Sequence, residues 1–249
     1  MKLLTTGRRK FPKLFIIKLF IIMWPIELVK ARALAAGADT PKAVIILTGA
    51  LNPVHNGHVA SLVHARAAVE EAGIAVLAGV LSPSHETYVR PKMARTAGGR
   101  YWSTHDRLEC CRRATAGSDW MCVGAWEAAG PHTFWPDFPV VCQALQAELV
   151  ASEGLRDVRV YFVCGADHWK KCRLHRGMPG DLGLVVLPRD GVRARSDPKK
   201  RIVVASSAPP DVSSTRIRRC LEGRGPLHEG MLPPAVEEYL RECPLPPPE

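Results

Sequence analysis

Short apolar runs alternate with amphipathic segments along most of the chain. Six runs rich in Val, Ile and Leu predict buried strands at 43–47, 74–81, 120–123, 158–164, 184–187 and 202–204. Helices are predicted at 59–72, 104–116, 140–150 and 216–221, and a last helix follows Pro233-Pro234. Because strands and helices alternate, we predict an α/β fold: a single Rossmann-like domain with a doubly wound parallel sheet.

Residues that follow the predicted strands are the first candidates for a site. In open α/β sheets, ligands bind beyond the carboxyl ends of the strands. The residues in those places are Gly49, Ser82, Trp126, Gly165 and Arg189. Loops are predicted at 84–100, 130–139 and 188–201, the last of them strongly basic.

The two ends of the chain differ from this pattern. Residues 1–32 carry eight Lys and Arg against Glu27 alone, a net +7, which leaves +3 for the rest of a chain of net charge +10. The apolar run between Lys18 and Glu27 is too short to span a bilayer. We expect an N-terminal extension over 1–40, a single domain over 41–243 and a frayed tail over 244–249.

The extension fits either a targeting or disordered segment or a start upstream of the true one. We expect no stable membrane span and a cytoplasmic protein, with an organellar or nuclear destination left open if the extension is a real signal. The sequence does not fix the oligomeric state, and a homo-oligomer stays open.

Composition narrows the chemistry further. With 249 residues and 47% hydrophobic content, the chain can build a core without disulfides, so we expect its eight cysteines to be mostly buried, reduced thiols. The small excess of charge outside the extension is explained by phosphate-bearing small molecules, and we expect no nucleic-acid partner. The sequence has no Cys-x-x-Cys and no compact carboxylate cluster, so we expect no metal held by the protein itself.

The most informative segment runs from Gly49 to His58, directly after the first strand. It places His55 and His58 at the start of a helix, where unpaired N–H groups and a partial positive charge favour an anion. Three residues apart, the two imidazoles project from roughly one face and can reach the same phosphoryl group. The pattern predicts a site for phosphoryl or nucleotidyl transfer, a reaction accelerated mainly by positioning and charge stabilisation.

A second phosphate-binding segment is predicted near the C-terminus. Ser213, Ser214 and Thr215 form a hydroxyl-rich helix start, and Arg218 follows on the same face as Thr215. Such an arrangement is typical of a phosphate clamp.

Four segments together resemble the nicotinamide/nicotinate mononucleotide adenylyltransferases of the HxGH nucleotidyltransferase superfamily. They are Gly49-x-x-Asn52-Pro53-x-x-x-x-His58, Leu81-Ser82-Pro83 with Tyr88, Cys164-Gly165-Ala166-Asp167, and Val212-Ser213-Ser214-Thr215-Arg216-Ile217-Arg218-Arg219. The resemblance implies adenylyl transfer from ATP to nicotinamide or nicotinate mononucleotide, giving NAD or its deamido form plus pyrophosphate, in NAD biosynthesis. It implies Mg²⁺ carried by the ATP phosphates rather than by the protein.

The resemblance also implies a role for particular residues. His58, with His55, would contact ATP phosphate during attack on the α-phosphorus. The residues implied in ATP and phosphate binding are Gly49, Ala50, Arg90, Lys92, Arg189, Ser213, Ser214, Thr215, Arg216 and Arg218. Those implied in mononucleotide binding are Tyr88, Trp126, Trp135, Gly165 and Asp167.

Departures from the family pattern leave some assignments open. Either Arg90 or Lys92 could bind pyrophosphate, and Trp126 could belong to the core while Trp135 stacks on the pyridine ring. Trp169 follows Asp167 almost immediately, a spacing that departs from the family pattern, so the wall that recognises the base is expected to differ. The preference between the amide and the acid mononucleotide is therefore open. Two other functions remain as alternatives: another HxGH nucleotidyltransferase, of the pantetheine-phosphate adenylyltransferase or cytidylyltransferase type, and a basic module that binds nucleic acid or a membrane.

Overall fold

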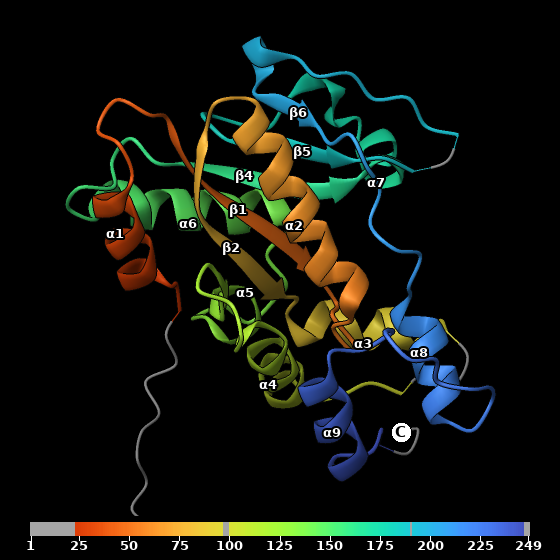
Figure 1. Ribbon diagram of the computed structural model, residues 1–249. Coiled ribbons are helices and arrows are strands. Elements are labelled where there is room, and N and C mark those ends of the chain that lie inside the picture. Colours follow the sequence, from red (N-terminus) through yellow and green to blue (C-terminus); the bar gives the residue numbers. More distant parts are fainter. Residues whose placement is uncertain (1–22, 97–99, 190, 247–249) are drawn as a thin grey trace, which may run out of the picture.

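A six-stranded parallel sheet forms the centre of the protein (Figure 1). The computed structural model describes residues 23–96, 100–189 and 191–246. The strands are β1 (Lys42–Gly49), β2 (Ala75–Pro83), β3 (Met121–Val123), β4 (Arg159–Gly165), β5 (Gly183–Leu187) and β6 (Ile202–Val204). Their order is β3-β2-β1-β4-β5-β6, and every pair is parallel, which confirms the predicted Rossmann-like fold.

Helices cover both faces of this sheet. They are α1 (Ile26–Ala35), α2 (Asn56–Glu71), α3 (Glu86–Ala94), α4 (Thr104–Thr115), α5 (Trp126–Ala129), α6 (Phe138–Ala151), α7 (Ala166–Lys171), α8 (Ser214–Leu221) and α9 (Pro234–Glu242), with two short 3₁₀ turns at Leu174–Arg176 and Pro198–Lys200. Figure 1 shows α2 in front of the sheet and α6 behind it. The central strand is therefore shielded from water on both sides.

Side chains of β1 alternate between two hydrophobic clusters. Ala43, Ile45 and Leu47 pack into the cluster that also holds α2, α4 and α9. Val44 and Ile46 pack into the opposite cluster, which includes α1 and α6. All five are buried, as expected for a parallel strand with helices on both faces, and this explains why the run is uniformly apolar.

The predicted loop at 84–100 is wrong in its first half, because α3 occupies residues 86–94. The imidazole of His85 caps this helix by accepting a hydrogen bond from the Thr87 N–H at 3.2 Å. Val89 and Met93 pack against Ala50, which gives the helix a buried side. Pro91 hides the helix from sequence reasoning, because proline usually interrupts helical periodicity.

Residues 23–40 lie within the segment predicted to be an N-terminal extension, and they pack against the domain. Trp24 is buried and stacks on Trp126 with ring centroids 5.8 Å apart, and Val29 of α1 is fully buried. The predicted extension over 1–22 lies outside the described residues. At the other end, Leu245 is buried and its carbonyl accepts a hydrogen bond from Arg100, so the described part of the predicted tail is held against the domain.

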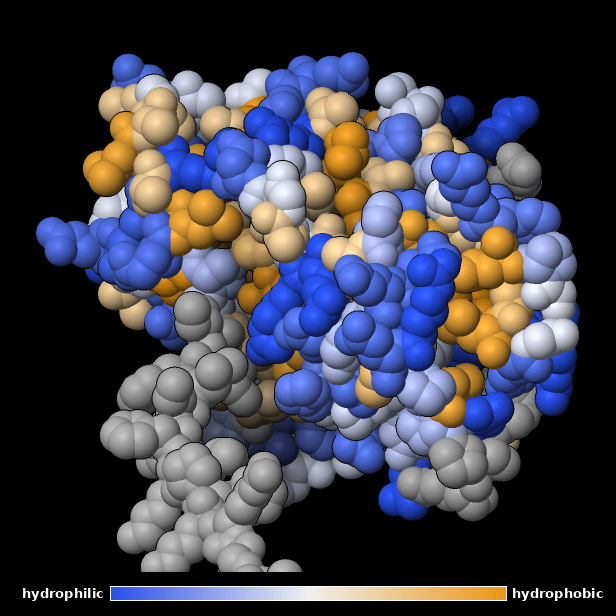
Figure 2. Space-filling model, turned by 60° about the horizontal axis from the view of Figure 1, so that its bottom comes forward, coloured by the Kyte–Doolittle hydropathy of each residue, from blue (hydrophilic) through white to orange (hydrophobic). Residues whose placement is uncertain are grey.

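The surface combines hydrophilic and apolar areas. Figure 2 shows one face on which hydrophilic side chains dominate the middle, with groups of apolar side chains on either side of it. Among the residues that the structure describes, no helix is both long and apolar enough to cross a membrane. All eight cysteines are free; four are buried and Cys172 is exposed, so burial holds for half of them.

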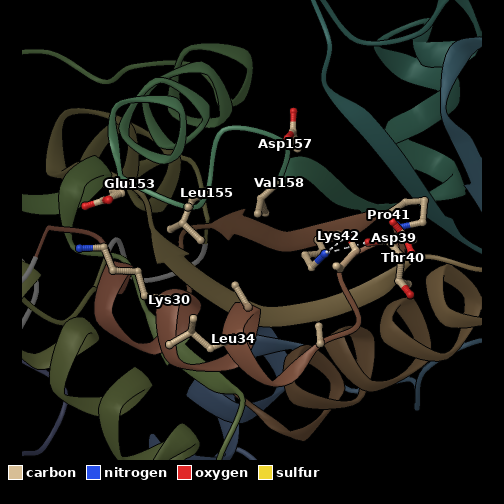
Figure 3. A pocket seen from close by; sticks show the side chains of 14 residues that line it. Lys30, Leu34, Asp39, Thr40, Pro41, Lys42, Glu153, Leu155, Asp157 and Val158 are labelled. Atoms are coloured by element: carbon tan, nitrogen blue, oxygen red, sulfur yellow. Dashed lines mark hydrogen bonds between the residues drawn. The ribbon is translucent and has the colours of Figure 1, made fainter.

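A large hollow lies at the amino ends of β1 and β4, away from the edge where α/β proteins bind ligands. It encloses about 890 Å³ between α1 and the turn at 153–158 (Figure 3). The Lys42 ammonium there donates to the carbonyls of Gly37, Ala38 and Thr40, at 2.8, 3.1 and 3.1 Å. The charge of Lys42 is thus engaged with its own loop, and this hollow is not the candidate site.

Candidate active site

The candidate site lies at the carboxyl ends of β1 and β4, where the order of the strands reverses. The chain continues from β1 to β2 and β3 on one side, and β4, β5 and β6 lie on the other. Loops that leave β1 and β4 therefore diverge and open a crevice between them. The first loop, 50–55, leads into α2, and the second leads directly into α7.

Hydrogen bonds from distant parts of the chain fix the loop between β1 and α2. The Asn52 side-chain oxygen accepts from the Trp102 N–H at 2.9 Å, and the Asn52 carbonyl accepts from the Arg218 guanidinium at 2.7 Å. The Ser214 hydroxyl donates to the Pro53 carbonyl at 2.9 Å. The start of α8 is therefore attached to the histidine loop, which brings the two predicted phosphate-binding segments together.

Arg107 of α4 connects this loop to neighbouring segments by hydrogen bonds. The side chain is fully buried, and its guanidinium donates to the carbonyls of Ala50, Ser84 and Trp102, at 3.2, 2.7 and 3.3 Å. A fourth bond reaches the Thr104 hydroxyl at 3.2 Å. All four acceptors are uncharged, and burial lowers the pKa of Arg107 from its ordinary value. One buried cation thus holds the ends of the loops that follow β1 and β2.

His55 and His58 lie at the start of α2 and stack on each other, with ring centroids 3.6 Å apart. The His55 backbone N–H donates to Nδ1 of His58 at 3.2 Å. In a neutral imidazole whose Nδ1 accepts, Nε2 carries the proton. His58 is therefore set to donate from Nε2, which suits a phosphate oxygen.

Burial, and after it the positive surroundings, keeps both imidazoles neutral. Burial lowers the pKa of His55 to about 4, and the charge of Arg189 adds to the effect. Burial, His55, Lys92 and Arg189 together hold the pKa of His58 well below its ordinary value. Neutral donors beside Lys92 and Arg189 form a site of positive potential, to which a polyphosphate is attracted.

Two cavities meet at these residues. One encloses about 320 Å³ and extends from the histidines to the start of α8. The other encloses about 510 Å³ and extends toward α7 and Trp135. Both are lined by Gly49, His58, Ser61, Lys92 and Arg189. Two ligands, one in each cavity, would thus approach each other beside His58.

Most of the predicted site residues line one or both cavities. Those in the smaller cavity are Gly49, Ala50, His55, His58, Lys92, Arg189, Ser213, Ser214, Thr215 and Arg218. Those in the larger cavity are Gly49, His58, Tyr88, Lys92, Trp135, Gly165, Asp167 and Arg189. Three predicted residues line neither: Arg90, Arg216 and Trp126.

Each of the three lies elsewhere for a clear reason. Arg90 of α3 and Arg216 of α8 are exposed, and neither lines a cavity. Trp126 packs on Trp24 within the hydrophobic cluster behind the sheet. The structure thus favours the core interpretation of Trp126 that the sequence left open.

Trp135 and Tyr88 form an aromatic wall of the larger cavity. Their rings stack with centroids 4.4 Å apart, and the Lys92 ammonium lies 5.1 Å from the Tyr88 ring centroid. Glu127 holds Trp135, accepting from its indole N–H at 3.3 Å and from the Ser82 hydroxyl at 2.8 Å. Burial raises the pKa of Glu127 to about 7, against the opposing effects of these donors and of Arg107.

Sequence reasoning missed Arg107 and Glu127. Arg107 shares the inner face of α4 with Cys111 and Thr115, at intervals of four residues, so the helical period alone indicates that it is buried. Glu127 directly follows Trp126, which was the predicted site residue in that segment. Neither was an obvious candidate, because charged residues are seldom fully buried.

The parallel sheet, its switch-point crevice and the neutral histidines beside two cations define a Rossmann-like nucleotide-binding protein of the transferase type. The chain belongs to the cytidylyltransferase-like family, whose model matches residues 46–220. The family resemblance that the sequence motifs indicated is thereby confirmed.

Individual relatives of this chain are named as adenylyltransferases of nicotinamide or nicotinate nucleotides. The nicotinamide/nicotinic acid mononucleotide adenylyltransferase of Arabidopsis thaliana is 24% identical over 82% of this chain and 90% of its own length. A probable nicotinate-nucleotide adenylyltransferase of Gloeobacter violaceus is 29% identical over 79% of this chain and 92% of its own. The Plasmodium falciparum nicotinic acid mononucleotide adenylyltransferase, solved in complex with NaAD, superposes with a TM-score of 0.51 at 11% identity, over 81% of this chain and 96% of its own. At that identity the superposition shows the shared fold.

Arg107→Met should destabilise the protein by about 3 kcal/mol, because three buried carbonyls lose a charged donor at once. The free energy of unfolding from urea titration, followed by circular dichroism, measures the loss. Arg112→Met is the matched control on the same helix: its partly exposed guanidinium pairs with Glu109, and its loss should change stability by less than about 1 kcal/mol. Equal losses in the two variants would contradict the role of Arg107.

Glu127→Gln should flatten the pH dependence of stability between about pH 5 and 8. A carboxyl whose pKa is raised on folding stabilises the protein below its unfolded pKa, and that contribution is lost as pH rises through about 7. The wild type should thus lose on the order of 2 kcal/mol over this range relative to the variant. Urea titrations at a series of pH values measure the difference. Parallel profiles would contradict the raised pKa.

Proposed function

We propose that this protein transfers the adenylyl group of ATP to nicotinamide mononucleotide, nicotinate mononucleotide or both. The products are NAD or its deamido form and pyrophosphate. The observation that carries the proposal is the pair of cavities that meet at His58, Lys92 and Arg189, one lined by hydroxyl and cationic groups and the other by aromatic rings. Relatives with the names given above support the same reaction.

We assign ATP to the smaller cavity. Hydroxyls of Ser213 and Thr215 and the start of α8 provide donors for phosphate oxygens there, and Lys92 and Arg189 provide positive charge. Because Lys92 lines both cavities and Arg90 lines neither, we assign pyrophosphate binding to Lys92. Arg218 acts indirectly: it bonds Asn52 and Thr215 and so positions the loop and the helix start.

We assign the mononucleotide to the larger cavity. The indole of Trp135 and the ring of Tyr88 provide flat apolar surface for a pyridine ring. Asp167 follows β4 directly and can accept hydrogen bonds from ribose hydroxyls. Glu127 is a positioning residue, since it holds Trp135 by its indole N–H.

The reaction we propose is a direct in-line displacement. A phosphate oxygen of the mononucleotide attacks the α-phosphorus of ATP, a new P–O bond forms, and the bond between the α-phosphorus and the bridging oxygen breaks to release pyrophosphate. His58 donates from Nε2 to a phosphate oxygen on which negative charge builds, and Lys92 and Arg189 stabilise the leaving group. Neither histidine needs to gain or lose a proton, in keeping with their lowered pKa values.

Magnesium fits this site as a companion of ATP. The described residues of the smaller cavity include nitrogen donors and hydroxyls but no carboxylate, so the protein offers few ligands that the ion prefers. When bound, Mg²⁺ supplies neutralisation of the phosphate charge. It would be held by phosphate oxygens and water.

The direct test incubates the purified chain with ATP, Mg²⁺ and either nicotinamide or nicotinate mononucleotide. We expect a dinucleotide and one equivalent of pyrophosphate, measured by chromatography, and the ratio of the two rates ranks the substrates. Parallel reactions contain phosphopantetheine with ATP, or CTP in place of ATP. Product only in those reactions would replace the proposal with another nucleotidyltransferase, and no product in any reaction from folded protein would overturn transferase activity.

His58→Ala should lower kcat by about 10²- to 10³-fold and change the Kd for ATP by less than about threefold, because the donor acts mainly on charge that builds in the transition state. Initial rates and equilibrium dialysis measure the two effects. His64→Ala is the matched control on the same helix, since His64 bonds Ser207 and lines neither cavity. Near-normal turnover of His58→Ala would refute the assigned role.

A further inference from the structure

A separate recess lies between α7 and the basic loop that precedes β6. It encloses about 570 Å³, and its walls include Trp169, His175, Arg193, Arg195, Lys199 and Ile202. It shares no lining residue with the two cavities of the active site. It therefore requires an explanation of its own.

Aromatic rings form one wall of the recess. Trp169 and His175 meet edge to face, with centroids 6.1 Å apart and an angle of 72° between the planes. In an edge-to-face contact only one of the two rings presents a face, so the other ring keeps both of its faces outside this contact. Within the described residues, the buried indole N–H of Trp169 has no hydrogen-bond partner, which leaves one donor unsatisfied.

Cations also line the recess. Arg193, Arg195 and Lys199 are exposed, and no described carboxylate forms an ion pair with them. Asp197 lines the recess as well, but it accepts from the Lys199 N–H at 3.1 Å and pairs with the Lys200 ammonium at 3.2 Å. With three cations and one carboxylate among its described lining residues, the recess has a net positive charge.

We propose that this recess binds a nucleotide, at a second site apart from the active site. The base would lie against Trp169 and His175, and at least two phosphates would pair with Arg193 and Arg195, because rings beside cations are the surroundings that nucleotides prefer. The site adjoins the transferase machinery through α7, a helix of six residues, since Asp167 and His168 of that helix line the larger cavity.

Equilibrium dialysis of the full chain with radiolabelled ADP tests the proposal. We expect the double variant R193S/R195S to bind one equivalent of ADP fewer than the wild type, with the second site weakened at least tenfold, whether or not the active site also binds ADP. The control R156S/R241S removes two exposed arginines elsewhere and should bind as much ADP as the wild type. Trp169→Leu should weaken the second site at least fivefold, and Trp169→Phe should retain it.

Three outcomes would overturn the inference. They are the same number of ADP equivalents on R193S/R195S as on the wild type, equal losses in R193S/R195S and in the control, and displacement of ADP from the second site by inorganic phosphate at an equal concentration. The last would show an anion site that does not recognise the base. Because the measurement counts bound ADP, its result does not depend on whether the proposed transfer reaction occurs.

Discussion

The buried guanidinium of Arg107 is the constraint on which the active site depends. It satisfies carbonyls of residues 50, 84 and 102, which belong to three segments far apart in the sequence. Burying a cation without a carboxylate partner is unfavourable, and several strong hydrogen bonds to oriented carbonyl dipoles are needed to offset it. Those bonds fix the relative positions of the β1 and β2 loops. The histidines after the first loop and Lys92 after the second are therefore placed relative to each other in part by these bonds.

Electrostatics at the site depends on the same packing. His55 and His58 lie close enough to stack, and two cations, Lys92 and Arg189, surround them. In such a place a protonated imidazole would be repelled and poorly solvated, so the neutral form is stable and His58 keeps a defined tautomer. The protein thereby combines positive potential with uncharged directional donors. That combination favours a reaction in which negative charge moves between phosphate oxygens.

A second buried ionisable group shapes the aromatic side of the site. Glu127 connects the end of β2, through Ser82, to the indole of Trp135. A buried carboxyl gives direction to a ring that apolar contacts alone would leave free to shift, because a hydrogen bond requires alignment. The buried guanidinium of Arg107 and the buried carboxyl of Glu127 thus hold the loops and the aromatic wall respectively.

The sequence by itself determined the sheet and the nature of the site. Apolar runs of three to eight residues predicted all six strands, since strands buried on both faces, as in the middle of this sheet, have few polar positions. His55, His58 and the hydroxyls at 213–215 were recognisable because helix starts bind anions through local geometry. Tertiary structure alone decided what Arg107, Glu127, Trp126 and α3 do. Arg107, Glu127 and Trp126 each have at least one partner more than 20 residues away in sequence, at Ala50, Ser82 and Trp24 respectively, and α3 depends on a buried side that outweighs Pro91. No local pattern records such contacts.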